Sequence, residues 1–374
     1  MRKNIIFFSG ETQFENTGDV LINKVLIDLI RENGDIIVDD KKMTEAYIKG
    51  LTLEKKERAP KSGFDLYLYK KALQALFSFG RTKVYFIVGP PGHLMGSSKF
   101  GRAAKTFLAS FKLLPLRLFG VKLIRIGFSI GPIGKAFGRI ESFRARFINY
   151  YGVRDDISLA LCRKIGISKA TFFPDLAWFY KPEFQRVNAD EKRIIITFRN
   201  TTHISGGGAN PYLAKLKEHL ARLCQFLTPN YRIEIVYQVA MDRTFCEELY
   251  NELRSQIQQI SFHATQVTLE NAEDIFSGAA AIITNRLHAA LLAYKYGALP
   301  IILTAKASHH KIIGIFQHAG IEDMIIDLDE DYRQNTRTIQ SSIDDKALIM
   351  NKIDTVERDY IAYGKKTFDG IFNR

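Results

Sequence analysis

The chain has 374 residues and a formal net charge of +13 at pH 7, with 46% hydrophobic and 25% charged residues. This composition is typical of a soluble globular protein, and the length predicts two domains of about 150 to 200 residues each. Three cysteines without CxxC spacing indicate buried thiols in a reducing compartment rather than a disulfide framework. No uncharged run is long enough to span a membrane, and the short apolar run near the start predicts a first β-strand of a cytoplasmic protein rather than a signal peptide.

The N-terminal half alternates short β-rich runs with helical patterns, which predicts a mainly parallel, doubly wound sheet. The predicted strands are residues 4–10, 35–40, 84–90, 121–131 and 150–155. The predicted helices are residues 17–33, 65–79, a basic helix between the third and fourth strands, 139–149 and 156–165.

The stretch from Lys99 to Arg146 contains eleven Lys and Arg residues and one acid, Glu141, so it holds ten of the thirteen excess charges. Within it, FLASFKLLPLRLF combines apolar residues and cations in one helical segment. No nucleic-acid-binding motif accompanies the charge, so a nucleic-acid partner is not expected. The pattern fits an amphipathic helix on an anionic membrane surface, and it fits equally a solvated basic face on a helix whose apolar side is core.

The polar stretch 182–193 has no periodicity and is predicted to be a linker. After it the alternation resumes with strands at 194–199, 232–238, 280–284, 300–304 and 324–328. The helices between them are one that begins at Pro211 with Asn210 as its N-cap, one near 242–258, one at 286–297 and closing helices at the end.

The expected fold is therefore α/β, with two Rossmann-like doubly wound domains facing across a cleft, as in GT-B transferases. The N-terminal domain is expected at residues 1–181 and the C-terminal domain at residues 182–350. A closing helix at 351–374 is expected to pack back on the N-terminal domain.

Two loops of the N-terminal half carry candidate functional residues. In NTGDVLI (16–22), Asn16 or Thr17 can cap the following helix and Gly18 permits a tight turn. Asp19 either complements the helix dipole or accepts a proton from a sugar hydroxyl. The glycine-rich GPPGHLMG (89–96) departs from both GxGxxG and the P-loop, and His93 within it is a candidate ligand contact.

Arg154 and Asp155 lie at a strand-to-helix junction in GVRDDIS (152–158). An Arg–Asp pair that orients the interdomain surface is favoured over direct catalysis. Arg154 is also a candidate contact for an acceptor.

In the second half, Gln238 and Asp242 lie at the end of the strand predicted at 232–238. Four further polar residues follow other predicted strands. If the sheet is parallel, four cationic or titratable side chains share its carboxyl edge: Arg199, Arg286, His288 and Lys311. Because arginine forks match carboxylate and phosphate oxygens two at a time, this edge predicts a site for a small, highly charged anion. Metal-binding and nucleophile motifs such as HExxH and GxSxG are absent from the sequence.

Seven segments taken in order resemble the polysaccharide pyruvyltransferase family, from about Asn16 to Lys311. The segments are NTGDVLI, VGPPGHLMG, IGFSIGP, GVRDDIS, FPDLA, QVAMDR and TNRLHAALLAYKYGALPII. The resemblance implies phosphoenolpyruvate as the donor, and as acceptor a sugar of a bacterial exopolysaccharide, capsule or cell-wall glycan or of its lipid-linked precursor. Gly-Pro-Pro-Gly stands where the family usually has consecutive glycines, which puts the acceptor side in question.

The resemblance also assigns residues. By position, the donor-binding residues are Arg199, Arg286, Leu287, His288 and Lys311, with Lys306 competing for the role of the lysine. The acceptor-binding candidates are Asn16, Gly18, Asp19, His93 and Arg154.

The expected reaction is pyruvyl transfer to two hydroxyls of one sugar, which forms a cyclic ketal, with His288 as acid and Asp19 as base. Phosphoenolpyruvate is a co-substrate in this scheme, and no metal or other cofactor is required. The alternatives are a GT-B glycosyltransferase that uses a nucleotide sugar, and a catalytically silent sugar- or membrane-binding subunit. The enzyme is expected in the cytoplasm, peripheral at the inner face of the plasma membrane.

Overall fold

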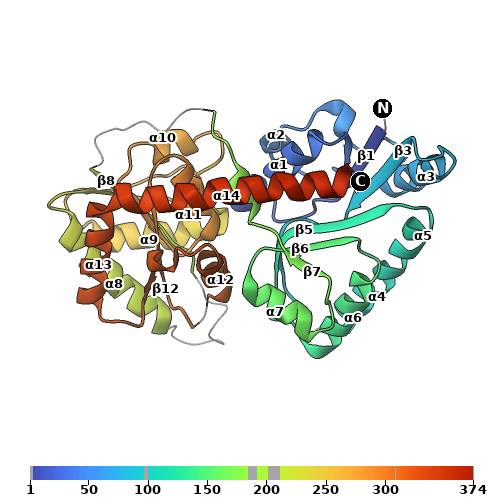
Figure 1. Ribbon diagram of the computed structural model, residues 1–374. Coiled ribbons are helices and arrows are strands. Elements are labelled where there is room, and N and C mark those ends of the chain that lie inside the picture. The colour runs from blue at the N-terminus through green and yellow to red at the C-terminus, as the bar shows by residue number, and fades with distance from the viewer. Residues whose placement is uncertain (1–2, 97–99, 184–191, 201–210, 308, 374) are drawn as a thin grey trace. The chain divides into compact units, whose positions relative to one another are not determined.

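The computed structural model describes residues 3–96, 100–183, 192–200, 211–307 and 309–373, with backbone only at 100–105 and 211. Within these residues the chain forms two compact units, each built on one parallel sheet (Figure 1). Unit 1 comprises Met1–Phe14, Asp19–Leu176 and Tyr360–Arg374, and unit 2 comprises Glu15–Gly18 and Ala177–Asp359. The prediction of two Rossmann-like α/β units is confirmed.

The division between the units differs from the expected one at 181 and 182, because it falls between Leu176 and Ala177. The residues just after it, in the 3-10 helix η2 (Leu176–Phe179), are core rather than linker, and Trp178 is fully buried. Lys295 of unit 2 donates to the carbonyl oxygen of Trp178 at 2.5 Å. Unit 2 therefore resumes before the polar stretch at 182–193 that the sequence predicts to be a linker.

The sheet of unit 1 has the strand order β2-β1-β3-β5-β6-β7, with β4 beside β5, and all its pairs are parallel. The strands are β1 (Lys3–Phe8), β2 (Asp35–Val38), β3 (Thr82–Ile87), β4 (Gly92–Leu94), β5 (Lys122–Ile130), β6 (Tyr150–Val153) and β7 (Ala170–Phe172). The sequence pattern did not predict β4 and β7, since three residues are too few to show a period.

The helices of unit 1 follow the predicted alternation. They are α1 (Thr17–Arg31), which begins in unit 2, α2 (Glu45–Gly50), α3 (Phe64–Leu76), α4 (Phe100–Phe111), α5 (Leu113–Leu118), α6 (Lys135–Ala145) and α7 (Asp156–Lys164), with the 3-10 turn η1 (Lys55–Glu57). The predicted basic helix is divided into α4 and α5. Pro115 explains the division, because a proline ring clashes with the carbonyl group four residues earlier, here that of Phe111.

The basic stretch is also partly internal, which the charge count did not reveal. Arg125 on β5 is 6% exposed, donates to the fully buried Glu141 and lies 4.4 Å from the ring centre of Phe128. Tyr151 donates to the same carboxylate at 2.9 Å. This charge therefore stabilises the core of unit 1 and contributes little to its surface.

The sheet of unit 2 has the order β10-β9-β8-β11-β12-β13, again with parallel pairs only. Its strands are β8 (Arg193–Thr197), β9 (Arg232–Ile235), β10 (Ile260–Phe262), β11 (Ala281–Thr284), β12 (Leu299–Thr304) and β13 (Ile325–Asp327). Every residue of β11 and β12 is buried, as expected for central strands covered on both faces.

The helices of unit 2 are α8 (Pro211–Leu227), α9 (Arg243–Leu253), α10 (Ala272–Phe276), α11 (Leu287–Lys295), α12 (His310–His318), α13 (Tyr332–Asp344) and α14 (Lys346–Phe372), with the 3-10 turns η4 (Ala240–Asp242) and η5 (Glu322–Met324). The predicted N-cap Asn210 lies outside the described residues. The first part of α14 belongs to unit 2, and from Tyr360 onward it belongs to unit 1, where Phe372 packs on Tyr85 with ring centres 4.8 Å apart. In the described part of the chain, no helix is long and apolar enough to span a bilayer.

Candidate functional site

The register of the unit 2 sheet places Arg199 and Arg286 side by side. Thr197, the last residue of β8, pairs with Thr284, the last residue of β11, and each arginine follows two residues later. The carboxyl edge of a parallel α/β sheet is where such folds bind ligands. The predicted common edge for these two residues is therefore present.

Asn285 fixes the backbone of the first arginine. Its Oδ1 accepts a hydrogen bond from the Arg199 amide at 2.9 Å, and its Nδ2 donates to the Arg199 carbonyl at 3.2 Å. The side-chain amide of Asn285 thus continues the hydrogen bonding between β8 and β11 beyond the ends of the two strands. Nδ2 also lies 3.3 Å from the hydroxyl of Tyr212 on α8. Sequence reasoning missed Asn285, although it directly precedes the arginine of the quoted TNRLHA segment.

Asp242 in η4 is the counter-charge of this edge. Nη2 of Arg286 donates to its Oδ1 at 2.5 Å, and the carboxylate is only 3% exposed. Burial raises the pKa of Asp242, and the charge of Arg286 opposes that rise. Burial, followed by the neighbouring Arg286, lowers the pKa of Arg199. Asp242 therefore pairs with Arg286 and acts on Arg199 only through its charge, so that among the described residues these two arginines outnumber the buried carboxylate beside them.

Four buried nitrogen atoms of this region have no hydrogen-bond partner among the described residues: Nε of Arg199, Nε of Arg286, Nε2 of Gln238 and Nε2 of His309. Buried donors without a partner cost free energy and are rare in native proteins. Residues 201–210, which follow Arg199, lie outside the described part of the chain. Unsatisfied donors beside an excess of positive charge suit a ligand that is rich in anionic oxygens.

His309 contributes a further ring to the same region, and sequence reasoning assigned it no role. It is 5% exposed, its Nδ1 contacts Oγ1 of Thr304, and its ring centre lies 6.0 Å from that of Tyr212. Burial, with the charge of Arg199 next, lowers the pKa of His309 to about 4. At neutral pH this imidazole is uncharged, so it can donate or accept one hydrogen bond without adding charge.

His288 lies in the first turn of α11, whose N-terminal amide groups carry the positive end of the helix dipole. Its side chain is 7% exposed and packs on Gly18. A Cβ atom on Gly18 would lie 2.6 Å from Nδ1 of His288, so no other residue fits there without moving the imidazole. Leu287, the first residue of α11, offers its backbone at the same helix end.

The segment Glu15–Gly18 belongs to unit 2, although the sequence pattern placed Asn16 and Gly18 with the N-terminal domain. Thr17 Oγ1 lies 2.6 Å from the carbonyl oxygen of Val267 and 3.1 Å from that of Gln238. Asn16 forms an isolated bridge with Val239, and its Oδ1 accepts a bond from the Gly18 amide at 3.0 Å. These long-range bonds hold Gly18 against His288, so both residues belong to one site.

The two candidate lysines lie near the same strand ends. Lys311 is half-buried in the first turn of α12, two residues after His309. Lys306 follows β12, and its backbone amide donates to Asp327 at 3.2 Å. The choice between them stays a prediction.

The remaining candidates lie in unit 1. The carboxylate of Asp19 accepts a bond from Oγ1 of Thr12 at 2.6 Å and from the amide of Gln13 at 3.3 Å, so it orders the loop after β1. The imidazole Nε2 of the exposed His93 contacts the carbonyl oxygen of Gly131, which precedes a cis peptide bond to Pro132. Their roles toward an acceptor stay predictions.

Arg154 is the most enclosed of the candidates. Its side chain is fully buried, and it donates to Asp175 at 2.5 Å and to Ser129 at 2.9 Å. Asp155 caps α7 by accepting a bond from the Ser158 amide at 2.6 Å. This arrangement favours a positioning role, and a contact with the acceptor stays a prediction.

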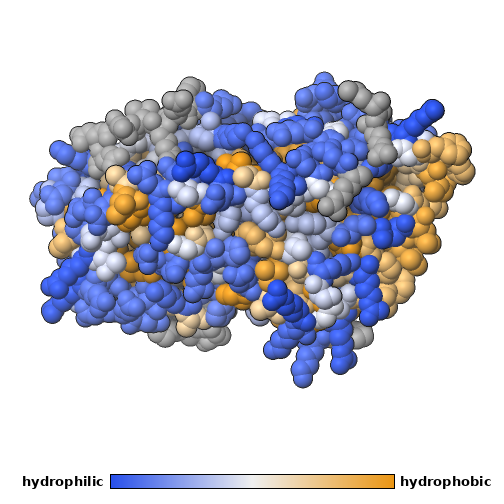
Figure 2. Space-filling view, viewed as in Figure 1, coloured by the Kyte–Doolittle hydropathy of each residue, from blue (hydrophilic) through white to orange (hydrophobic). Residues whose placement is uncertain are grey.

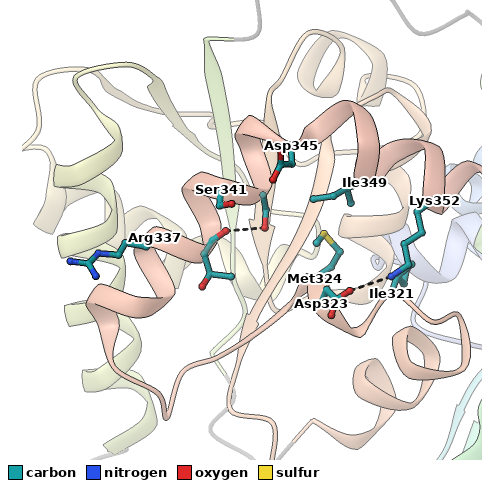
Figure 3. Close-up of a pocket in the computed structure, with 10 residues that line it drawn as sticks. Ile321, Asp323, Met324, Arg337, Ser341, Asp345, Ile349 and Lys352 are labelled. Carbon is teal, nitrogen blue, oxygen red and sulfur yellow. Dashed lines mark hydrogen bonds and ion pairs between the residues drawn. The ribbon is translucent and has the colours of Figure 1, made fainter.

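A cavity of about 460 Å³ in unit 2 lies apart from these side chains, between η5, α13 and the start of α14 (Figure 3). Its floor is apolar, with Ile321, Met324 and Ile349, and an ion pair of 3.2 Å joins Asp323 to Lys352 at its rim. Arg337 extends away from it. None of the candidate residues lines this cavity.

Solved structures of similar fold support the two-unit architecture. An Anabaena protein, HepE, in complex with UDP and glucose aligns with a TM-score of 0.60 and 10% identity, covering 100% of both chains. A UDP-N-acetylglucosamine 2-epimerase structure from Listeria monocytogenes aligns with a TM-score of 0.57 and 8% identity, covering 99% of this chain and 98% of the other. At such identities the likeness concerns the fold alone.

Sequence comparison identifies the family. A search of curated protein sequences gives no significant match. The sequence profile of the polysaccharide pyruvyl transferases matches residues 16–304, a span that runs from the loop holding Gly18 to the end of β12 and includes Arg199, Arg286 and His288. The chain therefore belongs to the polysaccharide pyruvyl transferase family.

Proposed function

We propose that this protein transfers the pyruvyl group of phosphoenolpyruvate to two hydroxyls of one sugar and so forms a cyclic ketal. The observation that carries the proposal is the pair Arg199 and Arg286, set side by side at a sheet edge, where Asp242 pairs with Arg286. Phosphoenolpyruvate carries a carboxylate and a phosphate on one enol carbon, and planar guanidinium forks match both groups.

The donor would be held from several directions. Arg199 and Arg286 offer the buried donors that lack a partner among the described residues, and the first turn of α11 adds its amide groups at Leu287 and His288. Lys311 or Lys306 would add a further positive charge. Preorganised donors of this kind stabilise developing charge because they need not reorient during the reaction.

The chemistry then requires an acid near the methylene carbon. His288, as imidazolium, would give its proton to that carbon, so that the C=C π pair forms the new C–H bond and the enol carbon becomes oxocarbenium-like. A sugar hydroxyl adds to this carbon and loses its proton, with Asp19 as the proposed base. The C–O bond to phosphate then breaks, phosphate leaves, and a second hydroxyl of the same sugar closes the ketal and loses its proton. General acid catalysis of this kind typically contributes about 10²- to 10⁴-fold.

Support for His288 in this role comes from its setting. Packing against Gly18 and a place in the first turn of α11 give the ring one position, and a fixed acid near its target is what efficient proton transfer requires. The scheme uses phosphoenolpyruvate as a co-substrate and needs no metal or further cofactor.

The acceptor is proposed to be a sugar of a bacterial surface polysaccharide, or of its lipid-linked precursor, with the enzyme peripheral at the inner face of the plasma membrane. Family membership supports a polysaccharide acceptor. Lipid linkage and membrane association draw support from the basic, apolar segment after residue 99.

A GT-B glycosyltransferase that uses a nucleotide sugar is the second candidate. It is favoured by the similar fold of the HepE structure that holds UDP and glucose. A diphosphate would suit the same pair of arginines.

One experiment separates the two candidates. The purified protein is incubated with phosphoenolpyruvate and a panel of lipid-linked and synthetic glycosides, and products are followed by mass spectrometry together with phosphate release. A product heavier by one pyruvyl unit, formed with one phosphate released per product, is expected. Thermal protection by UDP or UDP-sugars but none by phosphoenolpyruvate, with no pyruvylated product, would replace the proposal by the second candidate.

A further inference from the structure

Helix α3 of unit 1 has an apolar face on each side. Phe64, Leu68 and Ala72 face inward and are buried, as expected of a helix that packs on β3. On the opposite side Leu66 and Leu73 are 64% and 46% exposed, seven residues apart and therefore on one line of the helix. A helix that needed to bury one stripe only would have polar residues at these positions.

The turn after α3 continues the exposed line. Phe77 is 69% exposed and Phe79 is 97% exposed, which is the highest value among the exposed large apolar side chains of the described residues. Phe79 has a φ of 49°, a left-handed conformation that is strained for a bulky residue. Ser78 stabilises the turn, because its hydroxyl donates to the Ala75 carbonyl at 2.7 Å and accepts from the Thr82 amide at 3.0 Å.

The segment α4–α5 lies beside α3 and adds to the same surface. The hydroxyl of Tyr69 on α3 donates at 3.0 Å to the carbonyl oxygen of Lys112, which joins α4 to α5. Leu108 and Leu118 are 67% and 73% exposed. Figure 2 shows an apolar surface along the right edge of the molecule, over α3 and α5. We call these residues the α3–α5 patch: Leu66, Leu73, Phe77, Phe79, Leu108 and Leu118.

Cations surround the patch with little opposing charge. Residues 64–82 and 106–122 contain six cations and one carboxylate, Asp65, which is an exposed partner of Lys112 at 3.7 Å. The six cations are Lys70, Lys71, Arg81, Lys112, Arg117 and Lys122. Two copies of this surface would bring like charges together in a symmetric dimer, whereas anionic lipid headgroups would neutralise them.

We infer that the α3–α5 patch is the surface by which unit 1 inserts into an anionic lipid bilayer, with Phe77 and Phe79 as its tip. Aromatic and leucine side chains flanked by Lys and Arg are the pattern of interfacial membrane binding, because anionic lipid attracts the nearby cations. The inference rests on the proposed function in one respect, namely that a lipid-linked acceptor gives the enzyme a reason to bind the membrane. It moves the centre of the membrane contact from the basic helix alone to the turn after α3.

The main test is co-sedimentation with vesicles of phosphatidylglycerol and phosphatidylcholine. The double variant Phe77→Ser/Phe79→Ser should bind at least about tenfold more weakly than the wild-type protein, because two aromatic side chains no longer leave water. Leu348→Ser in unit 2 is the matched control, since Leu348 is equally exposed at 73% but lies outside the patch, and its vesicle binding should not change.

Two further measurements sharpen the result. The fluorescence emission of the Phe79→Trp variant should shift to shorter wavelength when vesicles are added. The emission of the fully buried Trp178, which both proteins contain, should stay constant. The triple variant Lys70→Ser/Lys112→Ser/Lys122→Ser should lose the preference for anionic over neutral vesicles.

Equal binding of the wild-type and the Phe77→Ser/Phe79→Ser proteins would overturn the inference. So would a dimer in sedimentation equilibrium that this variant converts to monomer without any change in vesicle binding. Pyruvyl transfer to a water-soluble glycoside, measured on the same variant, should be unchanged, so that failure of the membrane surface is distinguished from failure of the proposed reaction.

Discussion

The carboxyl edges of the two parallel sheets both carry buried or half-buried arginines, but the two edges offer these arginines different numbers of carboxylate partners. In unit 1, Arg154 donates to Asp175 and to Ser129, and the adjacent Asp155 is occupied by Ser129 and Ser158. In unit 2, Arg199 and Arg286 have one buried carboxylate near them, Asp242. The first edge balances its charge internally, and the second does not.

This difference predicts a structural role for the edge of unit 1 and a binding role for the edge of unit 2. A guanidinium that has a buried carboxylate of its own gains little from a ligand, whereas two guanidinium groups near one carboxylate gain much. The comparison predicts that changes at the unit 1 edge alter stability. Changes at the unit 2 edge should alter donor binding and turnover as well.

The largest effect is expected at His288. His288→Gln keeps a hydrogen-bond donor but no acid of suitable strength, so single-turnover rates should fall about 10²- to 10⁴-fold. Binding of phosphoenolpyruvate, measured by calorimetry, should survive because the arginines are unchanged.

Gly18→Ala is the companion variant, since its Cβ would push the imidazole without removing it. It should slow turnover in the same direction but by less. If His288→Gln only lowers the melting temperature and keeps near-normal turnover per folded molecule, the histidine is a packing residue and the acid lies elsewhere, with His93 or Asp19 the next to test.

The second effect is on stability and belongs to unit 1. Arg154→Met leaves the fully buried Asp175 without its partner, which should lower the free energy of unfolding by about 3 to 5 kcal/mol. Denaturant unfolding measures this, and the double variant Arg154→Met/Asp175→Asn should recover part of the loss. Donor binding by the folded fraction should be unchanged, and a specific loss of donor binding would remove the distinction between the two edges.

The sequence predicted the parts of this comparison that depend on local pattern. Alternating apolar runs and helical periods identified both sheets, and parallel strands necessarily bring their carboxyl ends together, which is why Arg199 and Arg286 were expected on one edge. That the two are neighbours on this edge follows from the pairing of β8 with β11. The pairing of Arg286 with Asp242, the clamp by Asn285 and the attachment of Glu15–Gly18 to unit 2 depend on contacts between residues far apart in the chain. No period or motif encodes such contacts.

Surface properties were hidden from the sequence for a similar reason. The count of charges in the basic stretch does not show which cations are internal, and Arg125 is an interior residue because Glu141 meets it from α6. The helical pattern at 65–79 does not show which apolar residues are covered, and the tertiary structure leaves Leu66 and Phe77 largely exposed.

A smaller effect is expected on the affinity for the donor. Arg286→Ala removes charge-assisted hydrogen bonds and should weaken phosphoenolpyruvate binding by roughly 10- to 150-fold in calorimetry. Arg286→Lys should recover little, because an ammonium group cannot donate two parallel bonds to one anion.

Loss of the arginine also leaves Asp242 buried and unpaired, so stability must be separated from binding. The double variant Arg286→Ala/Asp242→Asn removes both charges and is the proper reference for folding. If it binds phosphoenolpyruvate as well as the wild-type protein does, Arg286 is a structural partner of Asp242 like Arg154 in unit 1, and the two edges are alike after all.

The smallest effect is a pH dependence of stability that comes from the unit 2 edge. Burial, with Arg199 and His310 next, lowers the pKa of His309 to about 4, while an unfolded histidine titrates near about 6.5. Below about pH 6.5 the unfolded chain therefore binds a proton that the native protein does not, and stability falls as the pH falls toward the native pKa. Between pH 6.5 and 5 the loss should be about 2 kcal/mol.

The His309→Gln variant isolates this contribution, because glutamine cannot titrate. Its free energy of unfolding, measured in urea from pH 7 to 5, should vary less with pH than that of the wild-type protein. His219 on α8, whose pKa burial also lowers, acts in the same direction in both proteins and cancels in the difference between the two curves. Saturating phosphoenolpyruvate should flatten the wild-type curve if the imidazole contacts the bound anion, because a nearby negative charge raises the pKa of His309 toward that of the unfolded chain. An identical slope in the two proteins would mean that the pKa of His309 is the same in the native and unfolded states, and that burial does not keep this imidazole neutral below about pH 6.5.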